Sequence, residues 1–166
     1  MTNVISTPTS LPDFHNLDID FDIIDSHHHL FDLGQVYYPW LTDNQEPNMF
    51  LGNYDSIKQN YLPADYRADM GDLRIIKTVH VEAETDREDP VAETRWLVKS
   101  MQDSNLPSAI VAHAWLNAPN SESILAAQSE FKEVRGIRSK PITSMNAKTR
   151  DFVRAKPRSL QDPKWR

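Results

Sequence analysis

Short apolar runs alternate along the chain with longer stretches in which apolar residues recur every three or four positions. Apolar runs rich in β-branched residues are typical of buried strands, and the longer spacing is typical of amphipathic helices. The predicted strands cover residues 21–25, 74–84, 109–116 and 134–138. The predicted helices cover residues 62–71, 90–104 and 122–132. Strands and helices therefore alternate through most of the sequence.

This alternation predicts an α/β fold built from parallel βαβ units with right-handed crossovers. Residues 1–19, rich in Thr, Ser, Pro and Asn, predict a flexible leader, and residues 139–166 have no strand pattern. Residues 32–60 are a long aromatic segment without a clear period. Such a segment is either a lid or binding surface, or packing over a core, and both alternatives stay open.

Three consecutive histidines, His27, His28 and His29, follow the first predicted strand directly. Because side chains alternate faces along a strand, His27 and His29 are expected on one face and His28 on the other. Two imidazoles on one face can converge on a single cation, and neutral imidazole is a common zinc ligand. The alternative is a polar strand end with solvated histidines. The run is short and lies inside the chain, which argues against a cloning tag.

Other polar and aromatic side chains fall at the ends of the later strands. The even positions of the strand at 74–84 are expected to share one face, and they are Thr78, His80, Glu82 and Glu84. Trp115 and Arg138 lie at the ends of the third and fourth strands. Because ligands of parallel sheets bind at the carboxyl ends of strands, these residues and the histidines are expected at one site.

The chain has 166 residues, enough for one domain with a core, and a net charge of −6. The charge is uneven: residues 148–166 carry seven basic and two acidic side chains, and the first 147 carry 11 basic and 22 acidic ones. A chain this acidic does not suggest a nucleic-acid partner. The short basic tail is expected to be a solvated loop.

The chain contains no cysteine, which excludes disulfides, thiolate metal sites and cysteine nucleophiles. A metal would have to be bound by His, Asp, Glu or a modified Lys. No run approaches the roughly 18 apolar residues of a membrane span. Residues 1–16 lack the basic region and apolar core of a secretion signal. A cytoplasmic protein without a membrane partner is therefore expected.

The segment Asp25-Ser26-His27-His28-His29 resembles the Asp-small-His-x-His signature of the amidohydrolase superfamily. Further segments resemble the amidohydrolase-related group (amidohydrolase family 2), which includes sugar lactonases and dicarboxylate lactonases. These segments are residues 38–41, 61–66, 79–83, 136–138 and 160–166. The resemblance covers about residues 20–166. His-x-His alone is a weak signal, whereas several motifs in family order are a specific one.

The resemblance implies a TIM (β/α)8 barrel whose first strand supplies His27 and His29 to a divalent metal, commonly zinc. In such sites the metal acidifies a bound water and polarises a carbonyl, and the hydroxide attacks an ester or amide. Some relatives work without a metal and hold the substrate with the histidines and an arginine. Glu82 and Arg138 are expected at the barrel mouth as substrate contacts. The alternative for both is an internal ion pair across the barrel.

Such a barrel takes about 200–250 residues or more, and this chain supplies four strands. The resemblance therefore implies the N-terminal half of a barrel, about four βα units, in a truncated domain spanning residues 20–166. The later strands of the family supply further histidines and the aspartate that acts as general base, so the catalytic base is unknown here. Strands one and four would have unpaired edges, which predicts pairing with a second half-barrel or self-association.

Two classes of function follow. The first is a hydrolase that opens a lactone, or a related cyclic ester or amide, with a metal-activated water; its partner is a small lactone-like substrate. The second is a non-catalytic fragment or half-barrel module that binds a metal or a complementary chain. Substrate identity does not follow from the sequence, because specificity in such barrels is set by loops.

Overall fold

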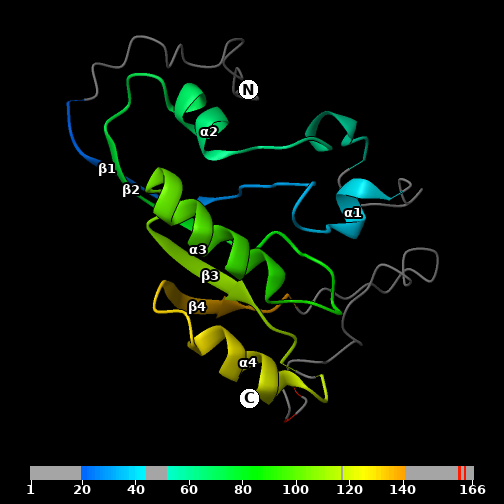
Figure 1. Ribbon diagram of the computed structural model, residues 1–166. Helices are drawn as coiled ribbons and strands as arrows, with labels where there is room; N and C mark the ends of the chain where they lie inside the picture. The colour runs from blue at the N-terminus through cyan, green and yellow to red at the C-terminus, as the bar shows by residue number, and fades with distance from the viewer. Residues whose placement is uncertain (1–19, 44–51, 117, 141–160, 162, 164–166) are drawn as a thin grey trace, which may run out of the picture.

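The centre of the protein is a four-stranded parallel sheet whose strands lie side by side in chain order, β1-β2-β3-β4 (Figure 1). A computed structural model describes residues 20–43, 52–116, 118–140, 161 and 163. The strands are β1 (Ile23–His28), β2 (Ile75–Val81), β3 (Ala109–His113) and β4 (Val134–Arg138). All four predicted strands are present, and the α/β class is confirmed. The predicted leader and most of residues 139–166 lie outside the described residues.

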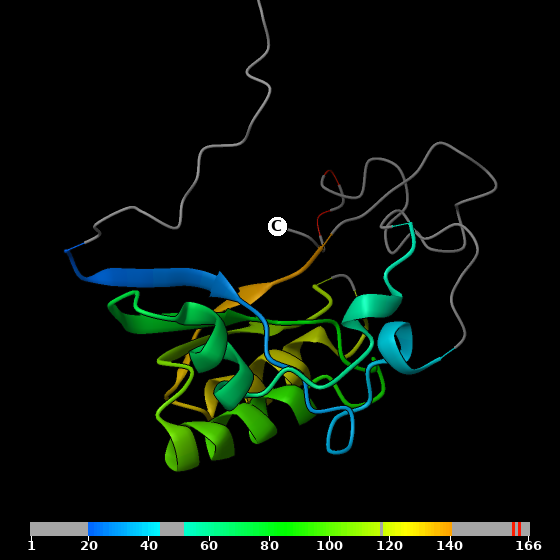
Figure 2. The ribbon, with the colours of Figure 1, turned by 90° about the horizontal axis from the view of Figure 1, so that it is seen from above.

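Three helices connect the strands, and all three were expected from the sequence pattern. They are α2 (Pro63–Met70), α3 (Ala92–Ser104) and α4 (Ser121–Ser129). Sequential strand order with right-handed crossovers places such helices on one face of the sheet. Figure 2 shows α2, α3 and α4 on the same side of the strands. No helix in the described part of the chain has the length and apolar character needed to cross a membrane.

The aromatic segment between β1 and α2 has little regular structure in its described part. It contains the short helix α1 (Pro39–Thr42) and the 3-10 turn η2 (Asp55–Ile57). Tyr38 is fully buried and Leu41 nearly so, and both belong to the main hydrophobic core. Packing over the core, one of the two alternatives for this segment, therefore describes these residues.

Local sequence accounts for the ends of two helices. Pro63 begins α2, where the missing N–H of proline costs no helical bond. The Asp65 carboxylate accepts the backbone N–H of Leu62 at 2.8 Å and so caps this end. Helix α3 is followed by Asn105 with φ of 58°, a left-handed conformation that asparagine adopts more readily than most residues.

Helix α3 begins at Ala92, two residues later than its predicted start at Pro90. The carbonyl of Pro90 accepts a hydrogen bond from the Gln128 side chain at 3.1 Å instead of a helical N–H. The Ala92 N–H closes a turn on the Asp89 carbonyl at 3.1 Å. The proline therefore lies in a turn before the helix and not in its first turn.

The hydrophobic core lies between the helices and the sheet. Trp96 and Leu97 of α3 pack in one cluster with Ile110 and Ala112 of β3. Leu97, Ile110 and Ala112 are at most 1% exposed. Full burial of an aliphatic side chain of the size of leucine or isoleucine contributes about 1.5–3 kcal/mol. This core fixes the sheet that carries the site.

A buried glutamine joins α4 to α3 and β3. The Gln128 amide accepts the Thr94 hydroxyl at 2.8 Å and donates to the carbonyls of Pro90 and His113 at 3.1 Å each. Because Gln128 is only 1% exposed, these protein groups take the place of water as hydrogen-bond partners of its side chain. A buried polar group is tolerated only when it is hydrogen-bonded, which makes this joint sensitive to substitution.

Strand β2 ends at Val81, three residues earlier than predicted, and β3 likewise ends early. Beyond Val81 the backbone N–H of Ala83 bonds to the Glu93 carboxylate at 3.0 Å, and Glu84 takes a φ of 61°. Because the chain turns out of the strand here, the alternation of faces stops. Glu82 and Glu84 therefore lie beyond the end of β2, although both carboxylates still contact Lys140.

Candidate functional site

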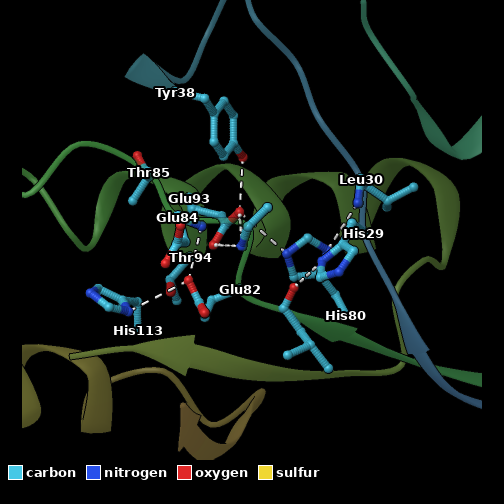
Figure 3. Close-up of polar contacts among 12 residues, drawn as sticks. His29, Leu30, Tyr38, His80, Glu82, Glu84, Thr85, Glu93, Thr94 and His113 are labelled. Carbon is cyan, nitrogen blue, oxygen red and sulfur yellow. Dashed lines mark hydrogen bonds and ion pairs between the residues drawn. The ribbon is translucent and has the colours of Figure 1, made fainter. Parts of the chain in front are cut away.

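The carboxyl ends of the parallel strands meet at one edge of the sheet, and the residues there form two groups on either side of Glu93. Figure 3 shows His29 and His80 on one side and Glu82 with His113 on the other. The histidine group comes from the ends of β1 and β2. The second group, built around Glu82, comes from the ends of β2, β3 and β4. We call His27, His29 and His80 the histidine group. We call Glu82 and its contacts His113, Arg138 and Lys140 the Glu82 group.

His27 and His29 lie next to each other, as the predicted alternation requires. Their ring centroids are 5.1 Å apart with the planes at 80°. The His28 ring instead packs on Tyr66 of α2, with centroids 4.7 Å apart. Strand β1 continues through His28, so the alternation of the strand extends into the run. His27 and His29 are thus close enough to bind one metal ion, and His28 faces α2.

His29 is held by the end of β2 in a defined tautomer. Its Nδ1 lies 2.7 Å from the carbonyl oxygen of Val81. A carbonyl only accepts, so Nδ1 carries the proton and Nε2 has the free lone pair. Burial, and in addition the nearby positive charge of Arg138, lowers the pKa of His29 to about 4. The ring is therefore neutral near pH 7, and its Nε2 can act as a ligand or a proton acceptor.

His28 behaves as a core residue. It is 8% exposed, and burial followed by repulsion from His80 lowers its pKa to about 4. Neither ring nitrogen has a hydrogen-bond partner among the described residues. The packing on Tyr66 accounts for an aromatic ring at this position. Nothing in the structure explains why that ring carries two buried nitrogens.

Asp25, two residues before His27 in β1, supports the histidine run. Its carboxylate accepts the backbone N–H of His27 at 3.0 Å and the Tyr66 hydroxyl at 2.7 Å. Burial alone would raise the pKa of Asp25, but these two hydrogen bonds and the neighbouring histidines lower it overall. The carboxylate thus remains charged and ties β1 to α2 beside the run.

Glu82 and Arg138, both predicted from the sequence, are brought into direct contact. Arg138 Nε lies 2.6 Å from Glu82 Oε1, and another guanidinium nitrogen donates to the Glu82 carbonyl. The Glu82 side chain is fully buried, whereas the Arg138 side chain is 26% exposed. This matches the ion-pair alternative for the two residues, and it leaves the guanidinium partly accessible.

Two further members of the Glu82 group were not singled out from the sequence. Lys140 Nζ lies 3.4 Å from Glu82 and 3.0 Å from Glu84, and His113 Nδ1 lies 3.5 Å from Glu82. Burial lowers the pKa of His113 despite the nearby carboxylates. The sequence held a signal for His113, which lies toward the end of a predicted parallel strand. It held a signal for Lys140 as well, because Lys140 lies two residues beyond Arg138 and so on the same face if the alternation continues. Trp115, which was singled out, packs on the His113 ring instead.

Within the histidine group, His27 and His29 have the donor atoms that a divalent metal would need from two of its ligands. The edge-on rings of His27 and His29, and the lone pair that the Val81 contact leaves on His29, provide two imidazole donors. Within the described part of the chain, no group of three or more His, Asp or Glu side chains is placed to hold a metal. A catalytic zinc site uses three protein ligands, so these two imidazoles by themselves would not complete one.

No protein-family model matches this sequence. "Uncharacterized protein y4mH" of Sinorhizobium fredii (strain NBRC 101917 / NGR234) is 35% identical over 150 residues, which are 89% of this chain and 48% of that protein. The chain therefore spans about half the length of this curated relative. A crystal structure of a zinc-bound amidohydrolase from Burkholderia multivorans matches with a TM-score of 0.49 and 22% identity, over 75% of this chain and 42% of that one. A likeness at this level does not establish a shared family.

Proposed function

We propose that this chain is part of a hydrolase of the amidohydrolase-related type that opens a lactone or a related cyclic ester or amide. The observation that carries the proposal is the pairing of His27 and His29 at the end of β1, with the Nε2 lone pair of His29 left free by its contact with Val81. The sequence motifs that accompany this pair, in family order, support the same function.

In this proposal His27 and His29 are two ligands of a divalent metal, with zinc the first to test. When bound, such a metal lowers the pKa of a coordinated water and polarises the carbonyl of an ester. The chain's own contribution is to present two imidazoles from a strand end. The outward part of the Arg138 guanidinium would contact the substrate. Glu82 is enclosed, so its contribution is to orient Arg138.

We further propose that the sheet is half of a (β/α)8 barrel. Its strands lie in chain order with the helices on one side, which is the order of consecutive strands in such a barrel. Within the described residues β1 and β4 each pair with one strand, and so each has a free edge. A complementary half, carried on the same or on a second polypeptide, would pair with both edges and supply the missing ligands and base.

The second candidate function is a non-catalytic half-barrel module that binds a metal or a complementary chain. It is supported by the described residues, among which no group of three or more His, Asp or Glu side chains could hold a metal, whereas hydrolytic zinc chemistry uses three protein ligands. The two candidates agree on metal binding and differ on turnover.

Zinc titration calorimetry tests the metal site shared by both candidates. We expect His27→Ala and His29→Ala each to weaken zinc binding by more than about tenfold, because a lost ligand should cost at least as much as a lost supporting contact. The matched control is His28→Phe, which keeps a ring against Tyr66 and should leave the affinity unchanged. An equal loss in all three variants would contradict the assignment of faces.

A lactone hydrolysis assay separates the two candidates. The chain is assayed with zinc, alone and together with the part of the curated relative that lies outside the matched 150 residues. Turnover that needs both pieces and is lost in His29→Ala supports the hydrolase. Zinc binding without turnover in either sample, over a panel of sugar and dicarboxylate lactones, supports the binding module.

A further inference from the structure

A chain of buried polar contacts runs from the histidine run to the aromatic segment through His80 and Glu93 (Figure 3). The Leu30 N–H donates to His80 Nδ1 at 3.2 Å, and His80 Nε2 lies 3.4 Å from Glu93 Oε1. The Tyr38 hydroxyl donates to the same Glu93 oxygen at 2.9 Å. Leu30, Tyr38 and His80 are fully buried, and Glu93 is 2% exposed.

The direction of these contacts defines the state of His80. A backbone N–H can only donate, so Nδ1 of His80 must be the acceptor and the proton of the neutral ring lies on Nε2. That nitrogen lies 3.4 Å from Glu93 Oε1, an ion-pair distance without hydrogen-bond geometry. Burial alone would raise the pKa of Glu93, but His80, the Tyr38 hydroxyl and the Ala83 N–H outweigh it and lower the pKa. The negative end of the chain of contacts is therefore kept charged.

Two adjacent residues of β2, His80 and Val81, contact His29 and the residue after it. His80 binds the N–H of Leu30, the residue that follows His29, and the Val81 carbonyl binds His29 Nδ1. The rings of His29 and His80 are nearly perpendicular, with centroids 6.1 Å apart. One contact fixes the backbone next to His29, and the other fixes its ring.

We propose that His80 and Glu93 are positioning residues for His29. His80 fixes the backbone at Leu30, Glu93 fixes the tautomer and orientation of His80, and the His29 ring is thereby held with Nδ1 on Val81 and Nε2 outward. This inference rests on the proposed role of His29 as a ligand, and it assigns a function to two buried residues that contact neither the metal nor the substrate.

Two substitutions at His80 separate positioning from simple packing. The side-chain oxygen of asparagine takes the place of Nδ1, so His80→Asn keeps an acceptor for the Leu30 N–H and loses the contact with Glu93. The side-chain nitrogen of glutamine takes the place of Nε2, so His80→Gln keeps the donor to Glu93 and loses the acceptor. Both leave a cavity where the ring was, and urea unfolding should show similar losses of stability.

The first readout is the tautomer of His29 in the zinc-free protein, from long-range nitrogen–proton correlations in NMR. We expect His80→Asn to keep His29 as the Nδ1–H tautomer and His80→Gln to give a mixture. The second readout is zinc affinity. It should fall about tenfold in His80→Gln, as is typical when a supporting contact of a metal ligand is lost. In His80→Asn, which keeps the contact with Leu30, it should fall less than about threefold.

The outcomes distinguish this inference from the proposed function. If the native chain shows the Nδ1–H tautomer but binds no zinc, the metal site fails and the positioning role stands on NMR alone. If His80→Gln and His80→Asn leave the same His29 tautomer, the pair is only structural and the inference is overturned. Should either His80 variant fail to fold, Glu93→Gln, which keeps an oxygen for Tyr38 and Ala83, is expected to shift the His29 tautomer in the same direction; an unchanged tautomer there overturns it.

Discussion

The Arg138 guanidinium and the Glu82 carboxylate are direct partners at the carboxyl edge of the sheet, with Nε and Oε1 2.6 Å apart. Glu82 follows the end of β2 and Arg138 ends β4, and β3 lies between these two strands. The ion pair therefore joins two segments on either side of β3. A fully buried carboxylate needs such a partner, since an unpaired buried charge is strongly unfavourable.

The first prediction concerns this ion pair. Arg138→Ala leaves the Glu82 carboxylate with the Glu84 N–H and the longer contacts to Lys140 and His113, without its closest charged partner. We expect it to lower the free energy of unfolding by about 3 kcal/mol. The matched control is Arg135→Ala on the same strand, whose side chain is exposed and whose loss should cost less than about 0.5 kcal/mol. Urea unfolding of both variants checks the difference, and equal midpoints would contradict the prediction.

The second prediction is a dependence of stability on pH. The pKa of Glu93 is lowered in the folded chain, whereas an unfolded glutamate titrates near about 4.3. The stabilisation by the Glu93 carboxylate is therefore complete above the unfolded pKa and is lost as the pH falls through the lower, folded pKa. Burial lowers the pKa of His113, so the unfolded chain gains a proton below about 6.5 and stability falls in the same direction.

Glu93→Gln isolates the carboxylate from the other titrating groups. We expect this variant to be less stable than the native chain at pH 7 and to lose less stability between about pH 5 and pH 3, because the group that titrates there is gone. The measurement is the urea midpoint at a series of pH values. Parallel pH profiles for the two proteins would show that Glu93 does not contribute.

The third prediction concerns the buried joint at Gln128. Gln128→Ala leaves the Thr94 hydroxyl and two backbone carbonyls without their partner, and we expect a loss of about 3 kcal/mol in the free energy of unfolding. The control is Gln102→Ala on α3, where the glutamine is exposed and the cost should stay below about 0.5 kcal/mol. Thermal unfolding of the two variants gives the comparison.

The fourth prediction follows from the exposed apolar side chains near the starts of β1 and β2. Phe21, Ile24, Leu73 and Ile76 are each between 39% and 62% exposed. Ile24 lies on a free strand edge, where apolar exposure favours association between chains. We expect Ile24→Glu to reduce self-association in sedimentation velocity, with little change in stability.

Ile57→Glu is the control for this experiment. Ile57 is 42% exposed but belongs to the turn η2 and not to a strand edge. The Ile57→Glu substitution should therefore leave self-association unchanged. Equal effects of the two substitutions would mean that added charge, and not the edge of β1, governs association.

Much of the fold follows from the sequence because its signals are local. The β-branched run of β2 and the helical spacing of α3 each identify an element without knowledge of its neighbours, and alternation of the two types implies parallel pairing. The separation of His27 and His29 from His28 also follows, since the two-residue period of a strand extends into the run. Element ends were less well predicted, because Val81 and Ala92 mark points where side chains from elsewhere take over the backbone bonds.

The sequence by itself determined the order of the elements, the face of the histidine run and the presence of Glu82 and Arg138 at strand ends. Only the tertiary structure decided that these last two pair with each other, that Lys140 and His113 join them, and that His80 and Glu93 lie behind His29. The physical reason is that these contacts join residues far apart in the chain, such as His29 with Val81 and Glu82 with Arg138. The packing of the strands and helices, and no local pattern, sets which of them meet.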